Sequence, residues 1–427
     1  MNQHAPAKPR LVMKFGGTSV ADVERIRRVG KLVAAEAAQG KQVAVVVSAM
    51  AGHTNQLVAW TDAAGRPAQG IGDSDDEYDS VVSGGEQVTA GLLAMVLRNE
   101  GVRARSWMGW QIPITTSEAH GRARIEDVGA DNLARSLATG EVAVIAGFQG
   151  VTRDGRVTTL GRGGSDTSAV AVAAALGAHC DIYTDVDGVY TTDPRIEARA
   201  RKLDQVSYEE MLELASLGAK VLNTRSVELA MARKVPVRVL SSFVDPEDIK
   251  PGWTEGRGTL VCEEDDVVEQ RIVSGVAYSR DEAKITLLGL PNRPGVPAGV
   301  FRRLAEASVN VDMIVQSRAR TSDSVNMEFT VPKRDAQRTL ELMQAYQAEI
   351  GFEEVRRDDE VAKISVVGVG MRSHAGVAET MFSALGEKGV TIQVISTSEI
   401  KISVLIDAAY TELAVRALHA AYGLEQV

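Results

Sequence analysis

The sequence predicts an α/β protein in which a mostly parallel β-sheet lies between helices, followed by two smaller modules with a common pattern. Short apolar runs alternate with helical patterns up to about residue 245, and the C-terminal part contains an internal repeat. Alternating strands and helices favour a parallel sheet, because parallel neighbours need a crossover connection that is usually helical. A chain of 427 residues has room for about two to four domains.

Composition and charge restrict the class of protein. The net charge of −10 argues against nucleic acid or an acidic membrane surface as a partner. The two cysteines, Cys180 and Cys262, are too few for a disulfide framework or a cysteine-based zinc site. Residues 1–10 lack the apolar core of a signal peptide, and no apolar run is long enough to span a bilayer. We therefore expect a cytoplasmic protein with no membrane partner.

The first part of the chain contains the elements of the predicted parallel sheet. Runs rich in Val and Ile are expected to be buried strands at Leu11–Phe15, Val43–Ser48, Val142–Ala146, Asp181–Thr184 and Val237–Leu240. Helical spacing is found over Val23–Gln39, Gly84–Asn99, Ser165–Leu176 and Tyr208–Lys234. In such sheets ligands bind at the carboxyl ends of the strands, so polar residues that follow these runs are the candidates for a site.

The second part of the chain is a repeat. Lys284–Gly289 matches Lys363–Gly368, and Val309–Ser317 falls on Val390–Ser398. Each copy has the order strand, helix, strand, strand, helix, which is the split β-α-β pattern. The expected strands are Ile285–Leu290, Val311–Gln316, Val325–Val331, Ile364–Val369, Ile392–Thr397 and Ile402–Ile406. Val267–Tyr278 is available as an additional strand for either copy.

The change to Pro, Gly and charged residues around Asp245–Gly258 indicates a linker between the two parts. The expected boundaries are therefore 1–245 for the first domain, 246–265 for the linker, 266–350 for the first module and 351–427 for the second.

The run Gly161–Ser168 is the most informative motif. It opens a helix of small residues, whose free N–H groups and partial positive charge suit an anion. Arg162 can hold a carboxylate through two parallel hydrogen bonds, and Asp166 adds a fixed negative charge. Such a run on its own is more often a glycine-rich turn before a helix, so its weight comes from companion motifs.

Other candidate residues follow the predicted strands. Lys14-Phe15-Gly16-Gly17 places a lysine next to glycine amides that can cradle phosphate, although the order is not that of a Walker A loop. Ser48 and Thr54 offer hydroxyl groups after the second strand, and Glu86 is a possible partner for a substrate ammonium group. Strand-ending turns and favourable helix starts explain these three residues equally well.

A further polar loop, Thr184–Arg195, also follows a strand. Its Asp, Gly and Pro residues are typical of a bare loop, and the functional interpretation is the rim of a nucleotide site. Lys14, Arg162, Arg195 and Lys220 are then cations on separate loops. No Ser-His-Asp set or metal-ligand spacing is evident. Cations with few bases suit phosphoryl transfer, which depends on positioning and charge neutralisation.

With these motifs together, the chain resembles the aspartate kinases of the amino-acid kinase family over nearly its whole length. The motifs that carry the resemblance are the Lys14 run, Ser48–Met50, Gly85-Glu86, Gly147–Gly150, Thr159–Asp166 and Thr184–Arg195. The repeat resembles the tandem ACT domains of these enzymes, which are ferredoxin-like βαββαβ modules that bind amino acids. The resemblance implies the amino-acid kinase fold for the first domain.

The resemblance also implies a reaction: ATP phosphorylates L-aspartate to 4-phospho-L-aspartate with Mg²⁺, the first step of lysine, threonine, methionine and isoleucine biosynthesis. It assigns charge stabilisation to Lys14 and the organisation of the lysines to Asp166. Arg162 would bind the aspartate α-carboxylate and Glu86 its ammonium, with Ser48 and Thr54 completing the pocket. The ATP site would be formed by Lys14, Gly16, Gly17, Thr184, Asp185, Tyr190, Arg195 and Lys220. No protein ligand to a metal is expected.

Feedback control by lysine, threonine or both follows from the same resemblance. The expected effector positions are Asn292, Asn310, Asp312, Gln316, Val377, Thr391, Ile392, Ser398 and Glu399. The chain departs from relatives at Asn292, where lysine-inhibited members often carry Asp, and at Ala378, where a threonine-binding member has Thr. Because ACT modules tend to pair across subunits, a homo-oligomer is expected by analogy.

Two other functions compete with this interpretation. One is another amino-acid kinase, which would act on acetylglutamate, glutamate or a nucleoside monophosphate. The tandem repeat and the placement of Glu86 argue against it. The other is a non-catalytic amino-acid sensor, against which the presence of both Lys14 and Asp166 argues.

Overall fold

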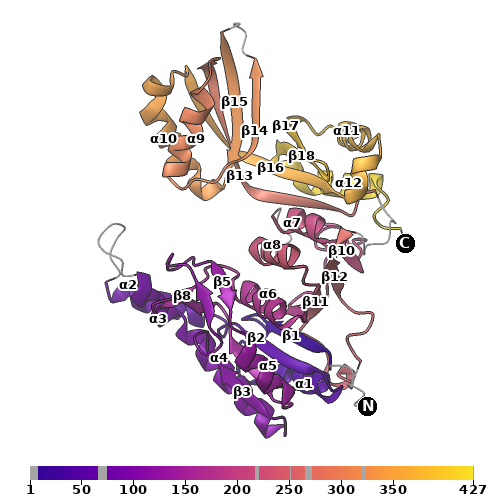
Figure 1. Ribbon diagram of the computed structural model, residues 1–427. Helices are drawn as coiled ribbons and strands as arrows, with labels where there is room; N and C mark the ends of the chain where they lie inside the picture. The colour runs from indigo at the N-terminus through magenta and orange to yellow at the C-terminus, as the bar shows by residue number, and fades with distance from the viewer. Residues whose placement is uncertain are drawn as a thin grey trace, which may run out of the picture. The chain divides into compact units, whose positions relative to one another are not determined.

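The computed structural model describes residues 8–65, 75–216, 221–250, 252–264, 272–318 and 323–426 (Figure 1). The chain forms two compact units. The first consists of Met1–Val189, Lys202–Ala215 and Lys220–Val268, and the second of Tyr190–Arg201, Ser216–Ala219 and Glu269–Val427. Both are α/β structures, and the predicted fold class is confirmed.

An eight-stranded sheet organises the first unit. Its order is β10 (Gln205–Ser207), β12 (Thr259–Cys262), β11 (Val237–Ser241), β9 (His179–Thr184), β1 (Arg10–Phe15), β2 (Gln42–Val47), β6 (Val142–Ala146) and β3 (Ala104–Trp107). All neighbours are parallel except β11 and β12. The predicted strands are therefore all present. Thr259–Cys262 was expected to be linker, but these residues form a paired strand inside the sheet.

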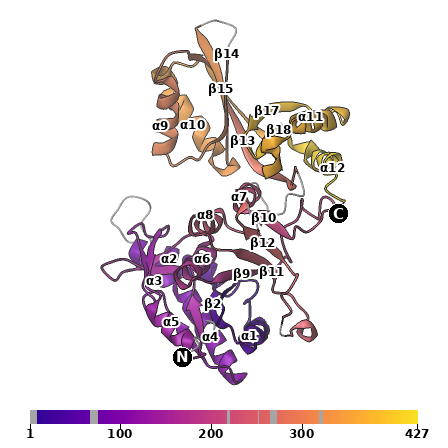
Figure 2. The ribbon, with the colours of Figure 1, turned by 45° about the vertical axis from the view of Figure 1, so that its right-hand side comes forward.

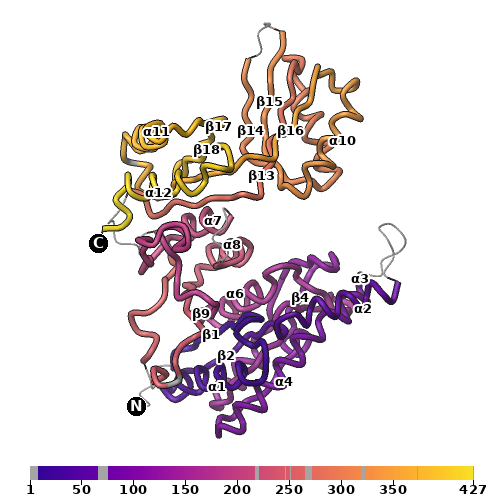
Figure 3. The backbone as a smooth tube through the Cα atoms, turned by 180° about the vertical axis from the view of Figure 1, so that it is seen from behind, coloured from indigo at the N-terminus to yellow at the C-terminus, as the bar shows by residue number. Residues whose placement is uncertain are grey.

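The first unit also contains α-helices, some of which pack on this sheet. They are α1 (Val23–Ala38), α2 (His53–Ala63), α3 (Asp75–Val82), α4 (Gly84–Asn99), α5 (Asp131–Ala138), α6 (Gly164–Leu176), α7 (Tyr208–Ser216) and α8 (Thr224–Arg233). Helices α1 and α4 contact one another (Figure 3) and form one core with the alternate β1 residues Leu11, Met13 and Phe15. Helix α6 packs on β1, β2 and β9. The helix expected over Tyr208–Lys234 is wrong in one respect, because α7 ends at Ser216 and α8 begins after Asn223.

Helices α3 and α4 together form an apolar stretch, Asp76–Asn99, that is long enough to cross a membrane by composition. Half of its most apolar window is buried inside the protein. Ala90, Leu93, Ala94 and Leu97 of α4 belong to the core beneath the sheet. This is the behaviour of a core helix.

A smaller four-stranded sheet adjoins the helices of the first unit. Its order is β5 (Ile125–Val128), β4 (Ile114–Thr116), β7 (Gln149–Val151) and β8 (Val157–Thr159). Strand β8 leads directly into the Gly161–Ser168 motif. The position of the motif therefore depends on this small sheet as well as on α6.

The second unit contains one six-stranded sheet. Its order is β14 (Asp312–Arg318), β15 (Ser324–Val331), β13 (Gly275–Pro291), β16 (Glu354–Val367), β18 (Lys401–Asp407) and β17 (Ile392–Thr397). Helices α9 (Val296–Glu306) and α10 (Lys333–Ile350) lie beside the β14–β15 half, and α11 (Val377–Glu387) and α12 (Thr411–Ala421) beside the β17–β18 half (Figure 2). Each half has its own hydrophobic core.

Strands β13 and β16 are shared between the two repeat modules. The end of β13 from Lys284 to Leu288 pairs with Glu354–Asp358, whereas Gly275–Ser279 pairs with Lys363–Val367. The first part of β13 therefore lies in the half that holds the second repeat. This places Gly275–Tyr278 of the additional strand proposed from the sequence, whereas residues 267–271 lie outside the described residues.

The segment Tyr190–Arg201 belongs to the second unit although the sequence on both sides of it belongs to the first. The Thr191 hydroxyl lies 3.0 Å from Nε2 of the buried His419 in α12. The Tyr278 hydroxyl donates to Asp193 at 3.1 Å, and Arg416 Nε donates to the Ile196 carbonyl at 2.8 Å. These bonds tie the segment to β13 and α12.

Candidate active site

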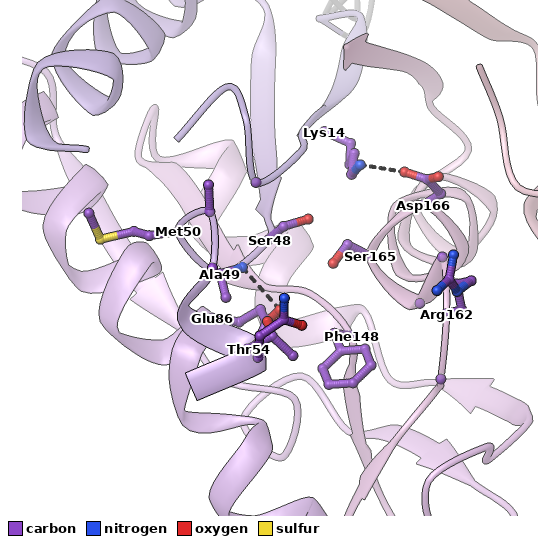
Figure 4. A pocket seen from close by; sticks show the side chains of 17 residues that line it. Lys14, Ser48, Ala49, Met50, Thr54, Glu86, Phe148, Arg162, Ser165 and Asp166 are labelled. Carbon is purple, nitrogen blue, oxygen red and sulfur yellow. Dashed lines mark hydrogen bonds and ion pairs between the residues drawn. The ribbon is translucent and has the colours of Figure 1, made fainter. Parts of the chain in front are cut away.

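A cavity of about 340 Å³ opens at the carboxyl ends of β1 and β2 (Figure 4). Residues from five separate parts of the first unit line it: Lys14, Gly17, Ser48, Ala49, Met50, Ala51, Gly52, Thr54, Asn55, Glu86, Phe148, Gly161, Arg162, Gly163, Gly164, Ser165 and Asp166. The structure therefore brings together the two residues expected to be catalytic, Lys14 and Asp166, and the four expected to bind substrate.

Lys14 and Asp166 form an ion pair on one wall of the cavity. Lys14 Nζ lies 2.5 Å from Asp166 Oδ1, and the two side chains are 11% and 13% exposed. Lys14 comes from β1 and Asp166 from the first turn of α6, where a carboxylate is favoured by the helix dipole. The pair holds the ammonium group of Lys14 toward the space between the strand end and the helix start.

Glu86 is a buried carboxylate on the opposite wall. Its Oε1 accepts a hydrogen bond from the Ala49 N–H at 3.0 Å, and no described residue donates to its Oε2. Gly85 permits this approach, since a Cβ at that position would lie 2.7 Å from the Ala49 Cβ. Burial raises the pKa of Glu86 to about 7, although the Ala49 N–H acts in the opposite direction. A cationic group in the cavity would satisfy the remaining oxygen.

Arg162 approaches the cavity from the other side, on the loop between β8 and α6. It has no ion-pair partner among the residues that the structure describes, so its guanidinium is available for an anion. Gly163 has φ +72° at the N-cap of α6, and a Cβ there would lie 2.3 Å from the Asn223 side chain. Only glycine suits both conditions. The loop therefore turns tightly enough to point Arg162 at the cavity (Figure 4).

Phe148 and Ser165 also line the cavity, and neither was an expected site residue. Phe148 has φ +67°, a strained conformation for an aromatic residue, and its N–H donates to the Ser168 hydroxyl of α6 at 3.1 Å. The Phe148 ring lies between the Glu86 and Arg162 sides of the cavity (Figure 4). The signal was present in the sequence, because Phe148 and Ser165 belong to motifs that had been singled out.

The residues expected around a nucleotide are divided between the two units. Thr184 ends β9, which pairs with β1 so that Tyr183 is opposite Phe15. The Thr184 hydroxyl donates to Asp185 at 3.0 Å. Gly16 follows β1 at the same end of the sheet. Tyr190 and Arg195 belong to the second unit, where Arg195 forms a bidentate pair with Asp193. Lys220 lies outside the described residues.

The expected effector positions all lie in the second unit. Asp312 begins β14 and pairs with the buried Lys363 of β16 at 2.5 Å, and Gln316 lies further along the same strand. Ile392 begins β17, and Glu399 pairs with Arg372 at 3.4 Å in the turn before β18. The remaining positions are Asn292, Asn310, Val377, Thr391 and Ser398, which are found at the ends of strands and helices.

Comparison with known proteins decides the family. Residues 9–241 match the model of the amino acid kinase family, and residues 285–345 and 364–422 match an ACT domain. The chain is 50% identical to the aspartate kinase of Stutzerimonas stutzeri over 97% of both chains. It is also 50% identical to the aspartokinase of Pseudomonas aeruginosa, over 97% of this chain and 98% of that one. The chain belongs to the aspartokinase family.

Solved aspartokinase structures agree with this assignment. Aspartokinase III of Escherichia coli in complex with aspartate and ADP shares 29% identity and a TM-score of 0.76, over 96% of this chain and 99% of that one. The same enzyme in complex with lysine and aspartate has a TM-score of 0.75. As a member of the aspartokinase family the chain is a phosphotransferase, and its ACT domains are the predicted repeat modules.

Proposed function

We propose that this aspartokinase transfers the γ-phosphoryl group of ATP to the β-carboxylate of L-aspartate. The observation that supports it most directly is the cavity, which is lined by an unpaired arginine, a half-satisfied carboxylate and the Lys14–Asp166 pair. An amino acid carries a carboxylate and an ammonium group on one carbon, and Arg162 and Glu86 complement these two charges. Ser48 and Thr54 complete the wall on the Glu86 side.

The chemistry needs positioning and neutralisation of charge. An oxygen of the aspartate β-carboxylate attacks the γ-phosphorus, the bond to the bridging oxygen breaks, and ADP leaves. A carboxylate is already ionised at neutral pH, so no general base is required. Lys14 stabilises the negative charge on the transferring group, and Asp166 holds Lys14 in place. The free N–H groups at the start of α6 add donors for phosphate oxygens.

Mg²⁺ would enter with the nucleotide. The described residues contain no group of three or more His, Cys, Asp or Glu side chains that could hold a metal ion. Mg²⁺ is commonly bound through substrate phosphates and water with one or two carboxylates, so the ATP phosphates would be its main ligands. When bound it would neutralise charge on those phosphates. From the sequence we propose that the nucleotide is bound by Gly16, Gly17, Thr184, Asp185, Tyr190, Arg195 and Lys220.

Regulation by amino acids forms the second part of the proposal. The ACT pair and the similarity to a lysine-bound aspartokinase support inhibition by lysine, threonine or both. Titrating activity against each amino acid, alone and combined, tests it, and flat curves throughout would reject it. We further propose that the protein is cytoplasmic, in line with the two free buried cysteines. We also propose that it forms a homo-oligomer, which a measurement of its size in solution tests.

A coupled ADP-release assay tests the activity itself. Aspartate should support ADP release, whereas N-acetylglutamate, glutamate and a nucleoside monophosphate should not. Release with N-acetylglutamate but not with aspartate would assign the protein to another reaction of the amino-acid kinases. Release with none of these substrates, together with retained lysine or threonine binding, would identify a sensor.

A further inference from the structure

The buried carboxylate of Asp79 lies outside the cavity and has no role in the reaction described above. Asp79 is in α3 and is 0% exposed. Its carboxylate accepts hydrogen bonds from the Thr159 N–H at 2.8 Å and the Thr159 hydroxyl at 2.5 Å. The Gly121 N–H donates to both oxygens at 3.0 Å, and His120 Nδ1 lies 3.0 Å from Oδ2. A single side chain thus joins α3 to the end of β8 and to the β4–β5 loop.

One of the residues that bind the Asp79 carboxylate lies directly before the loop that carries Arg162. Thr159 is the last residue of β8 and is followed by Leu160, Gly161 and Arg162. The same loop is also held by Arg225 of α8, whose Nη1 donates to the Leu160 carbonyl at 2.6 Å. Gly161 has φ +74°, and a Cβ there would lie 3.0 Å from the Gly121 carbonyl oxygen. The loop that carries Arg162 therefore rests on the contacts that Asp79 makes.

The main chain of Asp79 leads to the other half of the substrate pocket. Its carbonyl accepts from the Ser83 N–H at 3.0 Å, and Ser83 directly precedes Gly84-Gly85-Glu86 at the start of α4. The Ser83 carbonyl in turn accepts from Gln149 Nε2 at 3.1 Å. The Asp79 side chain thus joins the segment before Arg162 to α3, the helix that leads through Ser83 into the start of α4 and Glu86.

We propose that Asp79 is a positioning residue that sets the separation of Glu86 and Arg162 and thereby the affinity for the amino-acid substrate. Two substrate-binding groups on different elements gain affinity only when their separation matches the ligand. Asp79→Asn replaces one acceptor oxygen with an NH2 donor, so the Thr159 and Gly121 donors cannot all be satisfied and the loop must move to reach water. The proposal rests on the proposed function only for the identity of the substrate.

The test compares the KM values for aspartate and ATP in matched variants. Thr159→Val removes one donor to Asp79 and keeps the shape of the side chain, whereas Thr159→Ser keeps the hydroxyl. Asp79→Asn and Thr159→Val should raise the KM for aspartate about tenfold or more, the cost of a lost hydrogen bond to a charged group. The KM for ATP should stay within about twofold, and Thr159→Ser should behave like the unaltered protein. Thr159→Val in the Asp79→Asn background should add little.

Asp181→Asn is the control for a structural effect, because Asp181 is a buried carboxylate paired with Arg238 at 2.7 Å and lies at the start of β9 rather than at its carboxyl end. It should lower the melting temperature without raising the KM for aspartate. Equal KM values for Thr159→Val and Thr159→Ser, or equal effects of Asp79→Asn and Asp181→Asn on that KM, would overturn the proposal.

Hydrogen exchange provides a readout that needs no substrate. Amides in 157–164 and 117–124 should exchange faster in Asp79→Asn and Thr159→Val than in Thr159→Ser. Unchanged exchange there would show that Asp79 does not hold the loop, whatever the substrate. If the unaltered protein does not phosphorylate aspartate while the exchange rates respond as expected, the proposed function fails and the positioning role stands.

Discussion

Lys14 Nζ at the end of β1 lies 2.5 Å from Asp166 Oδ1 in the first turn of α6. The pair connects a strand end to a helix start across the cavity. A lysine held in this way keeps its charge directed at one point, which is what stabilisation of a developing negative charge requires.

Replacing Lys14 with Met should abolish phosphoryl transfer. Removal of one preorganised donor typically lowers kcat by about 10²–10³-fold, and Lys14→Met should lose at least that much in an ADP-release assay. Lys41→Met is the matched control, since Lys41 also pairs with a carboxylate, Glu36, at 2.5 Å but precedes β2 and does not line the cavity. A Lys14→Met protein with normal kcat would remove Lys14 from the mechanism.

The pH dependence of kcat/KM for aspartate should report Glu86. Burial raises its pKa to about 7, so Glu86 is protonated below that pH and ionised above it. Only the ionised form attracts the substrate ammonium, and kcat/KM should therefore rise as pH increases through about 7. In Glu86→Gln this limb should be missing and kcat/KM should be lower at pH 8. Persistence of the same limb in the variant would assign it to another group.

The same shift predicts how stability changes with pH in the absence of substrate. Because the pKa of Glu86 is raised from 4.5 to about 7, the folded state holds a proton that the unfolded state loses over this range. The contribution of Glu86 to the free energy of unfolding is about 3 kcal/mol. It is fully present below pH 4.5 and is lost as pH rises through about 7. Denaturant unfolding should therefore show Glu86→Gln more stable than the unaltered protein at pH 8, with a smaller difference at pH 5.

Arg162→Lys tests the recognition of the α-carboxylate. Lysine keeps the charge but loses the planar pair of donors, so the KM for aspartate should rise about tenfold or more while the KM for ATP changes little. Arg153→Lys is a suitable control because its side chain is 83% exposed and pairs only at the surface with Glu126. An equal rise in both KM values would indicate a general disturbance of the loop.

The Asp181–Arg238 pair predicts a large structural effect away from the cavity. Arg238→Met leaves the Asp181 carboxylate, 2% exposed, without its cation. Such a loss should lower the free energy of unfolding by about 3 kcal/mol. The double variant Asp181→Asn, Arg238→Met should recover part of this loss in denaturant titrations. A double variant less stable than Arg238→Met would contradict this account.

The sequence predicted which residues line one cavity better than it predicted the details of the fold. Lys14, Glu86, Arg162 and Asp166 do line one cavity. The carboxyl end of a parallel strand places Lys14 there, whereas Glu86 comes from the start of α4 and Arg162 and Asp166 follow β8 of the smaller sheet. The helix expected over Tyr208–Lys234 is interrupted at a capping residue, Asn223. The Asn223 side chain accepts from the Arg225 N–H at 3.0 Å and starts α8 there.

Strand pairing was harder to predict, because it depends on contacts that are distant in the sequence. Thr259–Cys262 is apolar enough to be a strand. Its partners β10 and β11 are separated from it in the sequence, so the local pattern does not predict this pairing. The sequence repeat describes each ACT module separately, so it does not predict that both modules share β13 and β16. The contacts of Asp79 could not be predicted for the same reason, since its partners are about 40 and 80 positions away in the sequence.

The segment Tyr190–Arg201 bears on how this protein can be divided in the laboratory. Its bonds to Tyr278, Arg416 and His419 lie with β13 and α12. A fragment that stops before residue 269 would keep this stretch but lose every one of those partners, and the hydroxyl of Thr191, buried in the intact chain, would face solvent. The catalytic part should therefore not be expressed without the ACT domains. The fragment would lack the residues that pack against Tyr190–Arg201, close to Thr184 in the sequence.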